Sequence, residues 1–497
     1  MPDRAALTQR AIVAGARAAR HLPGAVGGMG VYFWAQHRLA EDPRSAPWRE
    51  DVDVLLGHAD AALGRGRVDA ALRWFDKALR LCFDGSLHQA GSSPLAADPE
   101  GFLRAVRMSR TGRIMLPEDP PMPREPVRPA PRERGDGPAR LLVIAQENWT
   151  FIRPLLDALE ERYGVEVRTV DVDDLAAPGF ADRDRILRAR YDALQGGELL
   201  ETPPELAEGF DWADVVLVEW AHHVLTWVTQ LDRAPRRLAV RLHRFEAFTP
   251  FPLLTEASRI DHLLYVSPPV RTMLCRVAPA FAQVPAQQVG NLLTRGLGPE
   301  PGAESDAERD PHLIVQVGWL REIKDVMFSL DVLERLRAHD DRYRLRLIGP
   351  ALRADPSSDT PYQRRVRERL AAMDEGAVEI LGRREDVPAL LAEAGIVLSS
   401  SRHEGTHEAV MEGMAAGCAA VVRDWPETAA YGGAATIYDP RWVVADEDAA
   451  VERILELADP AVLAEASRAA RAFAVQQRDP DRVLARYAEG LELGERR

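Results

Sequence analysis

Two glutamates in the C-terminal third of the chain, Glu404 and Glu412, lie eight residues apart, and Glu408 lies halfway between them. A carboxylate can accept hydrogen bonds from two neighbouring hydroxyl groups of a sugar or a ribose. The three carboxylates therefore suit a site that reads a polyhydroxylated ligand. The alternative is an amphipathic helix whose carboxylates simply face solvent.

Lysine is rare in this chain, because only Lys77 and Lys324 among its 63 basic residues are lysines. Codon bias in a GC-rich genome would explain the general preference for arginine. Lys324 ends the segment Gly-Trp-Leu-Arg-Glu-Ile-Lys at 318–324, which follows an expected strand and opens a helix. Backbone N–H groups and the helix dipole at such a turn favour a diphosphate. Lys324 and Arg321 could stabilise a leaving diphosphate, although a solvated surface turn is the alternative.

The elements that must position these residues alternate between strand and helix. In the C-terminal half we expect strands at 312–317, 343–348, 378–381 and from 396, with helices at 325–339, 362–373 and within 386–394. After the strand that begins at 396 we expect a short polar loop, a Gly-rich helix and a further buried strand, all within 396–427. In the N-terminal half we expect strands at 140–145, 165–172, 214–219, 238–242 and 263–266, with helices at 150–163 and up to about 209. This alternation predicts an α/β fold with two Rossmann-like, doubly wound parallel sheets facing a cleft. Ligands bind such sheets at the carboxyl ends of their strands.

Composition divides the chain further. We expect a helical region at 1–116, a Pro-rich linker at 117–138, Rossmann-like domains at 139–295 and 312–476 joined by a linker at 296–311, and a C-terminal helix within 477–497. Gly66, Ala71, Phe75 and Ala78 fall where a tetratricopeptide-type repeat has small and aromatic packing residues. An ordinary amphipathic helical hairpin explains that segment equally well.

The first forty residues are basic and aromatic. Arg4, Arg10, Arg17, Arg20 and Arg38 are offset only by Asp3, and aromatic residues occupy 32–34. Such a helix could contact a protein or lie on the inner face of a membrane as a peripheral element. Packing on its own protein is the simpler alternative.

Bulk properties exclude several classes of function. A net charge of −14 argues against general nucleic-acid binding. The three cysteines form no CxxC pair, which fits a reducing, cytoplasmic compartment. No apolar run is long enough to span a bilayer and no secretory signal is convincing. No sequence pattern indicates a metal site or a resident cofactor.

The two α/β domains together resemble a known enzyme family. Residues from about 139 to 480 are similar to retaining glycosyltransferases of the GT-B type, in the large family numbered four. That family carries G-R-L-x-x-x-K after a strand, with the Arg and Lys on the donor diphosphate. Gly318, Leu320 and Lys324 match this pattern, but Trp319 replaces the arginine. Arg321 is the candidate to supply the missing charge.

The family also carries E-G-F-G, then a second Glu eight residues after the first. Glu404 and Gly405 match, whereas Thr406, His407 and Glu408 depart from the usual F-G-L. The resemblance implies that Glu404 contacts the transferred sugar and that Glu412 holds the ribose. It also implies that the backbone amides of 405–408 point at the donor, so the departures could alter the choice of sugar.

The resemblance extends to weaker positions. His243, at the end of a strand, matches the histidine that faces the reacting sugar in the family, and it could also hydrogen-bond the acceptor. Glu246 could be a second polar group there, with a helix-start carboxylate as the equal alternative. Arg383 or Arg384 could flank the base, although a solvated arginine pair is as plausible.

Two further loops could line an acceptor site. They follow other strands of the N-terminal half and comprise Gln146, Glu147, Asn148, Glu219 and Trp220. Trp220 could equally be a core residue.

Taken together, these features predict a retaining glycosyltransferase. It would move a sugar from a nucleotide-diphosphate sugar to a glycan, a lipid-linked acceptor or a protein. His243, Lys324 and Glu404 would be catalytic, and the last helix would return to the first Rossmann-like domain as in the family. Two alternatives stay open. One is a helical-repeat interaction protein fused to an inactive GT-B domain, and the other is a GT-B epimerase or phosphorylase.

Overall fold

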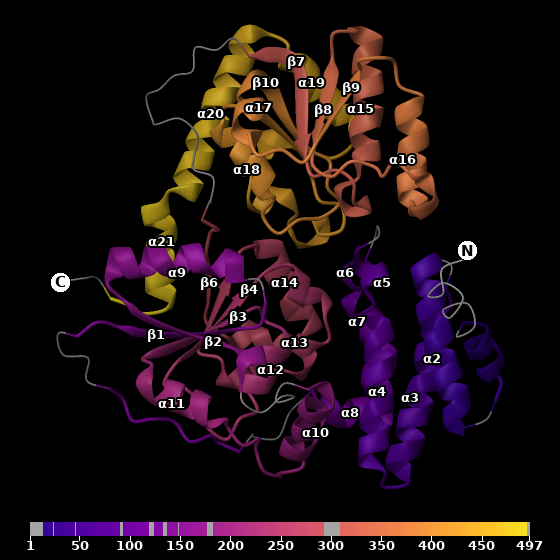
Figure 1. Ribbon diagram of the computed structural model, residues 1–497, viewed down its shortest axis with the longest axis vertical. Coiled ribbons are helices and arrows are strands. Elements are labelled where there is room, and N and C mark those ends of the chain that lie inside the picture. The colour runs from indigo at the N-terminus through magenta and orange to yellow at the C-terminus, as the bar shows by residue number, and fades with distance from the viewer. Residues whose placement is uncertain are drawn as a thin grey trace. The chain divides into compact units, whose positions relative to one another are not determined.

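The structure is a computed structural model that describes residues 13–22, 24–44, 46–89, 93–118, 124–132, 137–147, 149–175, 182–292 and 309–494. Arg4, Arg10, Asn148 and most of the linker at 296–311 lie outside these ranges. The chain forms two compact units. The first comprises residues 1–265, 273–287 and 488–497, and the second comprises 266–272 and 288–487. Figure 1 follows the chain through both.

The N-terminal region is helical, as the sequence predicts. Its helices are α2 (Gly24–Glu41), α3 (Trp48–Gly64), α4 (Val68–Cys82), α5 (Gly85–Gln89), α6 (Pro94–Ala97), α7 (Pro99–Met108) and α8 (Arg110–Met115). Helices α3 and α4 form a hairpin whose turn contains Gly66 at φ +72°. Ala71, Phe75 and Ala78 are buried on the inner face of α4. The tetratricopeptide character of this hairpin stays a prediction.

Charged contacts attach these helices to the first α/β domain. Arg183, at the start of α10 (Arg183–Leu194), pairs with Asp76 of α4 at 2.5 Å. Arg190 of the same helix is buried and donates to the carbonyl oxygen of Met115 at 2.8 Å. Arg188 pairs with Asp69 at 2.8 Å. The helical region and the first α/β domain therefore belong to one unit.

The first sheet has the strand order β2-β1-β3-β4-β5-β6. Its strands are β1 (Arg140–Ala145), β2 (Glu166–Asp171), β3 (Val215–Glu219), β4 (Leu238–Leu242), β5 (His262–Tyr265) and β6 (Ala286–Gln288). Its remaining helices are α9 (Trp149–Tyr163), α11 (Pro204–Trp212), α12 (His223–Val228), α13 (Phe251–Leu254) and α14 (Pro268–Val277). The strands with an assigned register pair in parallel. The sequence analysis identified every strand but β6, a three-residue edge strand.

The Pro-rich linker lies along this domain in its described part. Val127 donates its N–H to the carbonyl oxygen of Asp232 at 2.8 Å and forms an isolated bridge with Arg233. Arg132 pairs with Asp214 at the start of β3, at 3.2 Å. Proline excluded helix from this segment as expected, but hydrogen bonds to the domain still fix its path.

The second sheet has the strand order β12-β11-β10-β7-β8-β9. Its strands are β7 (Asp310–Val317), β8 (Arg344–Ile348), β9 (Val378–Gly382), β10 (Ala394–Ser399), β11 (Ala419–Arg423) and β12 (Val443–Val444). Its helices are α15 (Val326–His339), α16 (Pro361–Ala371), α17 (Val387–Glu393), α18 (Glu408–Ala415), α19 (Glu447–Glu456), α20 (Pro460–Arg478) and α21 (Pro480–Gly490). Counted from β7, this is the 3-2-1-4-5-6 order of a Rossmann fold, which reverses between β7 and β10.

Helices cover both faces of this second sheet (Figure 1). One apolar layer joins the sheet to α15, α16 and α19, and the other joins it to α17, α18 and α20. Because both faces are buried, apolar residues predominate in the central strands, and β10 is buried along its whole length. None of the helices in the described ranges has the length and apolar composition needed to cross a membrane.

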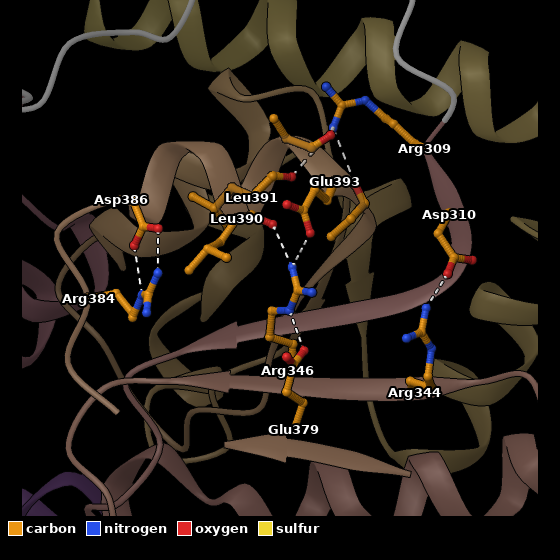
Figure 2. Close-up of polar contacts among 12 residues, drawn as sticks. Arg309, Asp310, Arg344, Arg346, Glu379, Arg384, Asp386, Leu390, Leu391 and Glu393 are labelled. Atoms are coloured by element: carbon orange, nitrogen blue, oxygen red, sulfur yellow. Dashed lines mark hydrogen bonds and ion pairs between the residues drawn. The ribbon is translucent and has the colours of Figure 1, made fainter. Parts of the chain in front are cut away.

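Several arginines of the second domain serve the fold. Arg346 on β8 is buried and bonds Glu379 of β9 at 2.7 Å and Glu393 of α17 at 2.8 Å (Figure 2). Arg309 donates to the carbonyl oxygens of Ala392 at 2.9 Å and of Ala416. These carbonyls lie at the ends of α17 and α18, where helices leave backbone acceptors without internal partners.

Gly413 lets α18 approach β10 closely. A Cβ atom added there would lie 2.8 Å from the Cβ of Val397. We expect Gly413→Ala to destabilise the domain by about 1–3 kcal/mol, because the helix must move away from the strand. Gly57→Ala, at an exposed position of α3 with nothing within 4 Å, is the matched control. It should leave stability unchanged or raise it by up to about 1 kcal/mol. Equal melting temperatures for Gly413→Ala and the wild type would contradict this packing.

Candidate functional site

Two loops follow the strands between which the second sheet reverses its order. The loop after β7 begins at Gly318, whose φ of +74° is favourable only for glycine, and its N–H donates to the carbonyl oxygen of Ile348. It ends in a short 3-10 turn at Glu322–Lys324 before α15 begins. The loop after β10 runs from residue 400 to 407 and leads into α18. Ligands bind at this position in doubly wound sheets.

Lys324 and Glu404 form an ion pair across these two loops. The Lys324 Nζ atom lies 2.5 Å from Glu404 Oε1, and both side chains are 15% exposed. The Ser401 hydroxyl donates to the same carboxylate oxygen at 2.6 Å. Burial by itself would raise the pKa of Glu404, but positive charge from His407 and Lys324 and these hydrogen bonds lower it to about 2. The carboxylate is therefore ionised at neutral pH.

His407 lies beneath this pair in a left-handed conformation, with φ +49°. This position is glycine in the family pattern, and glycine adopts such a conformation at no steric cost. The imidazole is buried, with Nδ1 hydrogen bonded to the Ser399 hydroxyl at 2.7 Å and Nε2 3.8 Å from Glu404 Oε1. Burial lowers the pKa of His407 to about 4. The ring is therefore neutral at pH 7.

A buried polar chain fixes the backbone of Lys324. The Ser329 hydroxyl donates to Gln316 Oε1 at 2.7 Å, and Gln316 Nε2 donates to the Ser400 hydroxyl at 2.9 Å. The Ser400 hydroxyl in turn donates to the carbonyl oxygen of Lys324 at 2.7 Å. Because buried polar groups without partners are costly, this chain holds the two loops in one arrangement.

Asp325 supplies a second tie between the loops. Its φ of +44° places it in the left-handed region, directly before α15. Arg423 at the end of β11 donates to Asp325 Oδ2 at 2.7 Å, and Arg402 lies 3.5 Å from the same oxygen. The N–H of Arg402 also donates to the carbonyl oxygen of Ile323 at 2.9 Å.

The departures at 406–408 are also part of the folded core. The carbonyl oxygen of Thr406 accepts a hydrogen bond from the Tyr438 hydroxyl at 2.7 Å, and the Thr406 hydroxyl donates to Glu408. The Glu408 carboxylate accepts from Arg478 and Asn291 as well. Its side chain is therefore occupied by the protein itself.

The positions after β7 differ in their surroundings. Trp319, which replaces the family's arginine, is 1% exposed and packs in the core beneath α15. Arg321 is exposed, so it can reach a ligand only from the solvent side of the loop. Gly318 lies beside the Lys324 side chain, with its hypothetical Cβ 3.7 Å from Lys324 Cε.

The other residues predicted to bind the donor differ in their exposure and in their contacts. Arg383 is exposed after β9, and Arg384 pairs with Asp386 through two contacts of 2.8 and 2.5 Å (Figure 2). Glu412 is half-buried on α18, one turn after Glu408. Gly405 is half-buried between Glu404 and Thr406.

In the first unit, His243 follows β4 and belongs to a buried charged cluster. Its Nε2 lies 2.9 Å from Oε1 of Glu219, the last residue of β3. Arg241 donates to the same oxygen at 2.7 Å. Burial raises the pKa of Glu219, but Arg241 and His243 lower it below its ordinary value. Glu246 is also buried and accepts the backbone N–H groups of Ala221 and His243, and burial raises its pKa.

The neighbouring loops of this sheet carry backbone strain. Glu147 after β1 has φ +63° and Trp220 after β3 has φ +70°, and the sheet order reverses between these strands. Gln146 bonds His223 at 2.5 Å, and the Trp220 ring lies against His243 with centroids 4.3 Å apart. Non-glycine residues in such conformations are found most often at functional sites.

Sequence reasoning missed the residues that support the ion pair. Ser399, Ser401 and Gln316 carry no motif of their own, and Asp325 acts through Arg423, which is 98 residues away. The run of three serines at 399–401 at the end of an apolar strand was the available signal. Within the described ranges, no group of three or more His, Cys, Asp or Glu side chains could hold a metal ion.

Comparisons with known proteins agree with this geometry. Residues 311–459 match the family described as "Glycosyl transferases group 1". The matched segment contains both loops, so this part of the chain is similar to glycosyltransferases of that group. No curated protein sequence gives a significant match.

Several solved structures are similar to this chain over part or most of its length. HepE from Anabaena, solved with UDP, superposes with a TM-score of 0.51 and 16% identity, over 71% of this chain and 99% of that one. A mutant O-GlcNAc transferase from Thermobaculum terrenum covers 98% of this chain and 97% of its own, at 17% identity and a TM-score of 0.47. TarM of S. aureus covers 56% of this chain at 13% identity and a TM-score of 0.43. The present chain spans 54% of TarM. The fold is GT-B, preceded by a helical region.

His407 generates a test of the site's electrostatics. Its pKa is about 4 in the folded protein against an ordinary 6.5, so the unfolded chain binds more protons between these values. Stability is therefore full above pH 6.5 and is lost as the pH falls toward 4. Between pH 7 and pH 5 the wild type should lose free energy of unfolding through His407. We expect His407→Asn, which tolerates the left-handed backbone, to reduce this loss by up to about 2 kcal/mol. Thermal melts at both pH values measure it. An unchanged difference between the two melting temperatures would contradict the buried, neutral state of His407.

Proposed function

We propose that this protein is a retaining glycosyltransferase that uses a nucleotide-diphosphate sugar as its donor. The observation that carries the proposal is the Lys324–Glu404 pair at the reversal point of the second sheet, inside the glycosyltransferase domain. A cation and a carboxylate at that point can hold the two ends of an activated sugar, the diphosphate and the hydroxyl groups.

Binding of the negatively charged donor would rearrange the Lys324–Glu404 ion pair. A diphosphate carries more negative charge than Glu404 and competes with it for Lys324. As the bond between the anomeric carbon and the diphosphate oxygen breaks, the diphosphate keeps the electron pair, and Lys324 stabilises that charge. An acceptor hydroxyl bonds the anomeric carbon and passes its proton to an oxygen of the departing diphosphate. The family resemblance supports attack on the face from which the nucleotide leaves.

The carboxylates would read the neutral parts of the donor. Glu404 would accept hydroxyl groups of the transferred sugar, and Glu412, one helical turn beyond Glu408, those of the ribose. Backbone amides of Gly405 to Glu408 would face the donor. Arg321 and Arg383, both exposed, would approach the diphosphate and the base from solvent. No resident cofactor or metal is part of this proposal.

His243 would serve the reacting sugar and the acceptor in the first unit. Its Nε2 is held by the ionised Glu219, which leaves Nδ1 to accept or donate a hydrogen bond. The Trp220 ring against His243 adds the flat apolar surface on which a sugar can stack. The acceptor is a glycan, a lipid-linked molecule or a protein, and the helical region offers a surface for a protein or membrane contact.

A second candidate is a GT-B domain without activity, used as a scaffold. The burial of Trp319 favours it, because the family's first cation is replaced by a core residue. A panel of nucleotide sugars decides between the two, since a scaffold neither binds nor turns over any of them. An epimerase or phosphorylase is excluded if nucleotide diphosphate is released only when an acceptor is present.

Nucleotide binding can be tested by thermal shift. We expect one of UDP, GDP, ADP or dTDP to raise the melting temperature of the wild-type protein, with UDP tested first because HepE was solved with it. A ligand at 100 times its dissociation constant stabilises by about 2.7 kcal/mol. Lys324→Met should abolish most of this shift, because the diphosphate loses its cation. A shift that survives unchanged in Lys324→Met would contradict the assignment of the diphosphate to this loop.

The two glutamates should separate binding from transfer. We expect Glu412→Ala to weaken nucleotide binding by about 10-fold or more, since a hydrogen bond to a charged group contributes about 1.5–3 kcal/mol. Glu404→Ala should mainly slow transfer, by about 100-fold. Calorimetry with the nucleotide and a transfer assay with the nucleotide sugar measure these effects. Glu368→Ala on the exposed face of α16 is the control. Unchanged affinity and rate in both glutamate variants would remove the site assignment.

A further inference from the structure

Glu408 joins the candidate donor loop to two segments that lead to points at which the chain passes between its units. The chain passes from the first unit to the second at residues 287–288 and returns at 487–488. Asn291 follows the first of these points closely. Arg478 is the last residue of α20, directly before α21 leads to the second point. Both side chains bond the Glu408 carboxylate.

The contacts of Glu408 leave little of its carboxylate unused. Arg478 Nε donates to Oε2 at 3.0 Å and the Nη2 atom donates to Oε1 at 2.9 Å, so the contact is bidentate. Asn291 Nδ2 donates to Oε1 at 3.0 Å, and the Thr406 hydroxyl also donates to Oε1. Arg478 is only 5% exposed. A bidentate arginine–carboxylate contact fixes orientation as well as distance.

The two connecting segments also contact each other. A Cβ atom added to Gly290 would lie 3.1 Å from Val483 and 3.4 Å from the Arg478 guanidinium. The Tyr487 hydroxyl donates to the carbonyl oxygen of Gly290 at 3.2 Å. The segment before Asn291 and the start of α21 therefore pack side by side, and Glu408 bonds both.

The position of Glu408 on the loop gives these contacts a mechanical role. Glu408 is the first residue of α18, and His407 before it is held by Ser399 beneath Glu404. If the loop moves, the Glu408 carboxylate must move with it. Its bidentate contact with Arg478 then breaks unless the connecting segments move as well. The loop and the connecting segments must therefore shift together or break these charge-assisted hydrogen bonds.

We propose that Glu408 is a positioning residue that couples occupation of the donor loop to the two connecting segments, and that its side chain is not a ligand of the donor. This inference rests on the proposed function, because it needs a nucleotide in the loop at 404–408. Coupling of this kind is reciprocal, so a nucleotide that orders the loop must also order the segments at 286–292 and 478–487.

The alternative is that Arg478 and Glu408 are an ordinary buried ion pair that only stabilises the domain. The same domain offers a control in a second buried arginine, Arg346. It bonds Glu393 at 2.8 Å and so links β8 to α17 (Figure 2). Glu393→Gln and Glu408→Gln each keep the shape of the side chain and remove one charge from a buried arginine.

Backbone hydrogen exchange of the full chain, measured with and without UDP, tests the coupling. If another nucleotide gives the largest thermal shift, that nucleotide replaces UDP. In the wild type and in Glu393→Gln, we expect the nucleotide to slow exchange at 404–412 and at both 286–292 and 478–487. In Glu408→Gln, we expect slowing at 404–412 alone, nucleotide affinity within about threefold of the wild type and transfer at least 10-fold slower, from coupling energies of about 1–3 kcal/mol.

The outcomes separate this inference from the proposed function. No protection at 404–412 in the wild type contradicts the proposed function and this inference with it. Protection at 404–412 with the connecting segments unchanged contradicts the coupling alone, as does full protection of those segments in Glu408→Gln. Asn291→Ala replaces Glu408→Gln if that variant does not fold, because it removes a single neutral donor. It should weaken protection at 286–292 while leaving 404–412 protected.

Discussion

The contact between Lys324 and Glu404 is the constraint on which the rest of the second domain's site depends. The two residues belong to loops 80 positions apart in the chain, and both are largely withdrawn from water. Removing one partner of such a pair strands a desolvated charge, which is strongly destabilising. The supporting hydrogen bonds from Ser401 and through Ser400 therefore serve the same end, because they keep the two charges together.

Much of the fold could be predicted because its signals are local. The alternation of apolar runs with helical segments located the strands of both sheets, and the bounds of β1 and β4 agree with the expected 140–145 and 238–242. The strands that were missed, β6 and β12, are edge strands of three and two residues. Such strands are too short to show a period, and their pairing with a neighbour creates them. The path of the Pro-rich linker, in its described part, could not be predicted from local sequence either, because it depends on contacts with the distant residues Asp214 and Asp232.

The site was predictable where spacing alone determines it and unpredictable where a distant partner does. The match to the family placed Lys324 and Glu404 on facing loops, which the structure brings together. It could not show that Trp319 enters the core beneath α15, because the residue type alone does not decide whether a tryptophan after a strand packs in the core or faces a ligand. Glu408 was grouped with the donor ligands by its position between two glutamates. Its partner Arg478 lies 70 residues further along the chain, and no pattern in either segment predicts the contact.

The departures from the family pattern form a consistent set when their contacts are compared. His407 replaces a glycine and fills the space beneath Glu404 with a ring that is neutral at pH 7. Thr406 and Glu408 replace the apolar Phe and Leu of the pattern and bond each other. The loop is thus held by side chains where the family pattern leaves its backbone freer. A loop fixed in this way spends less conformational entropy when a ligand binds. In the proposed glycosyltransferase, such a loop would also admit fewer shapes of sugar, so the same three substitutions would contribute to both selectivity and preorganisation.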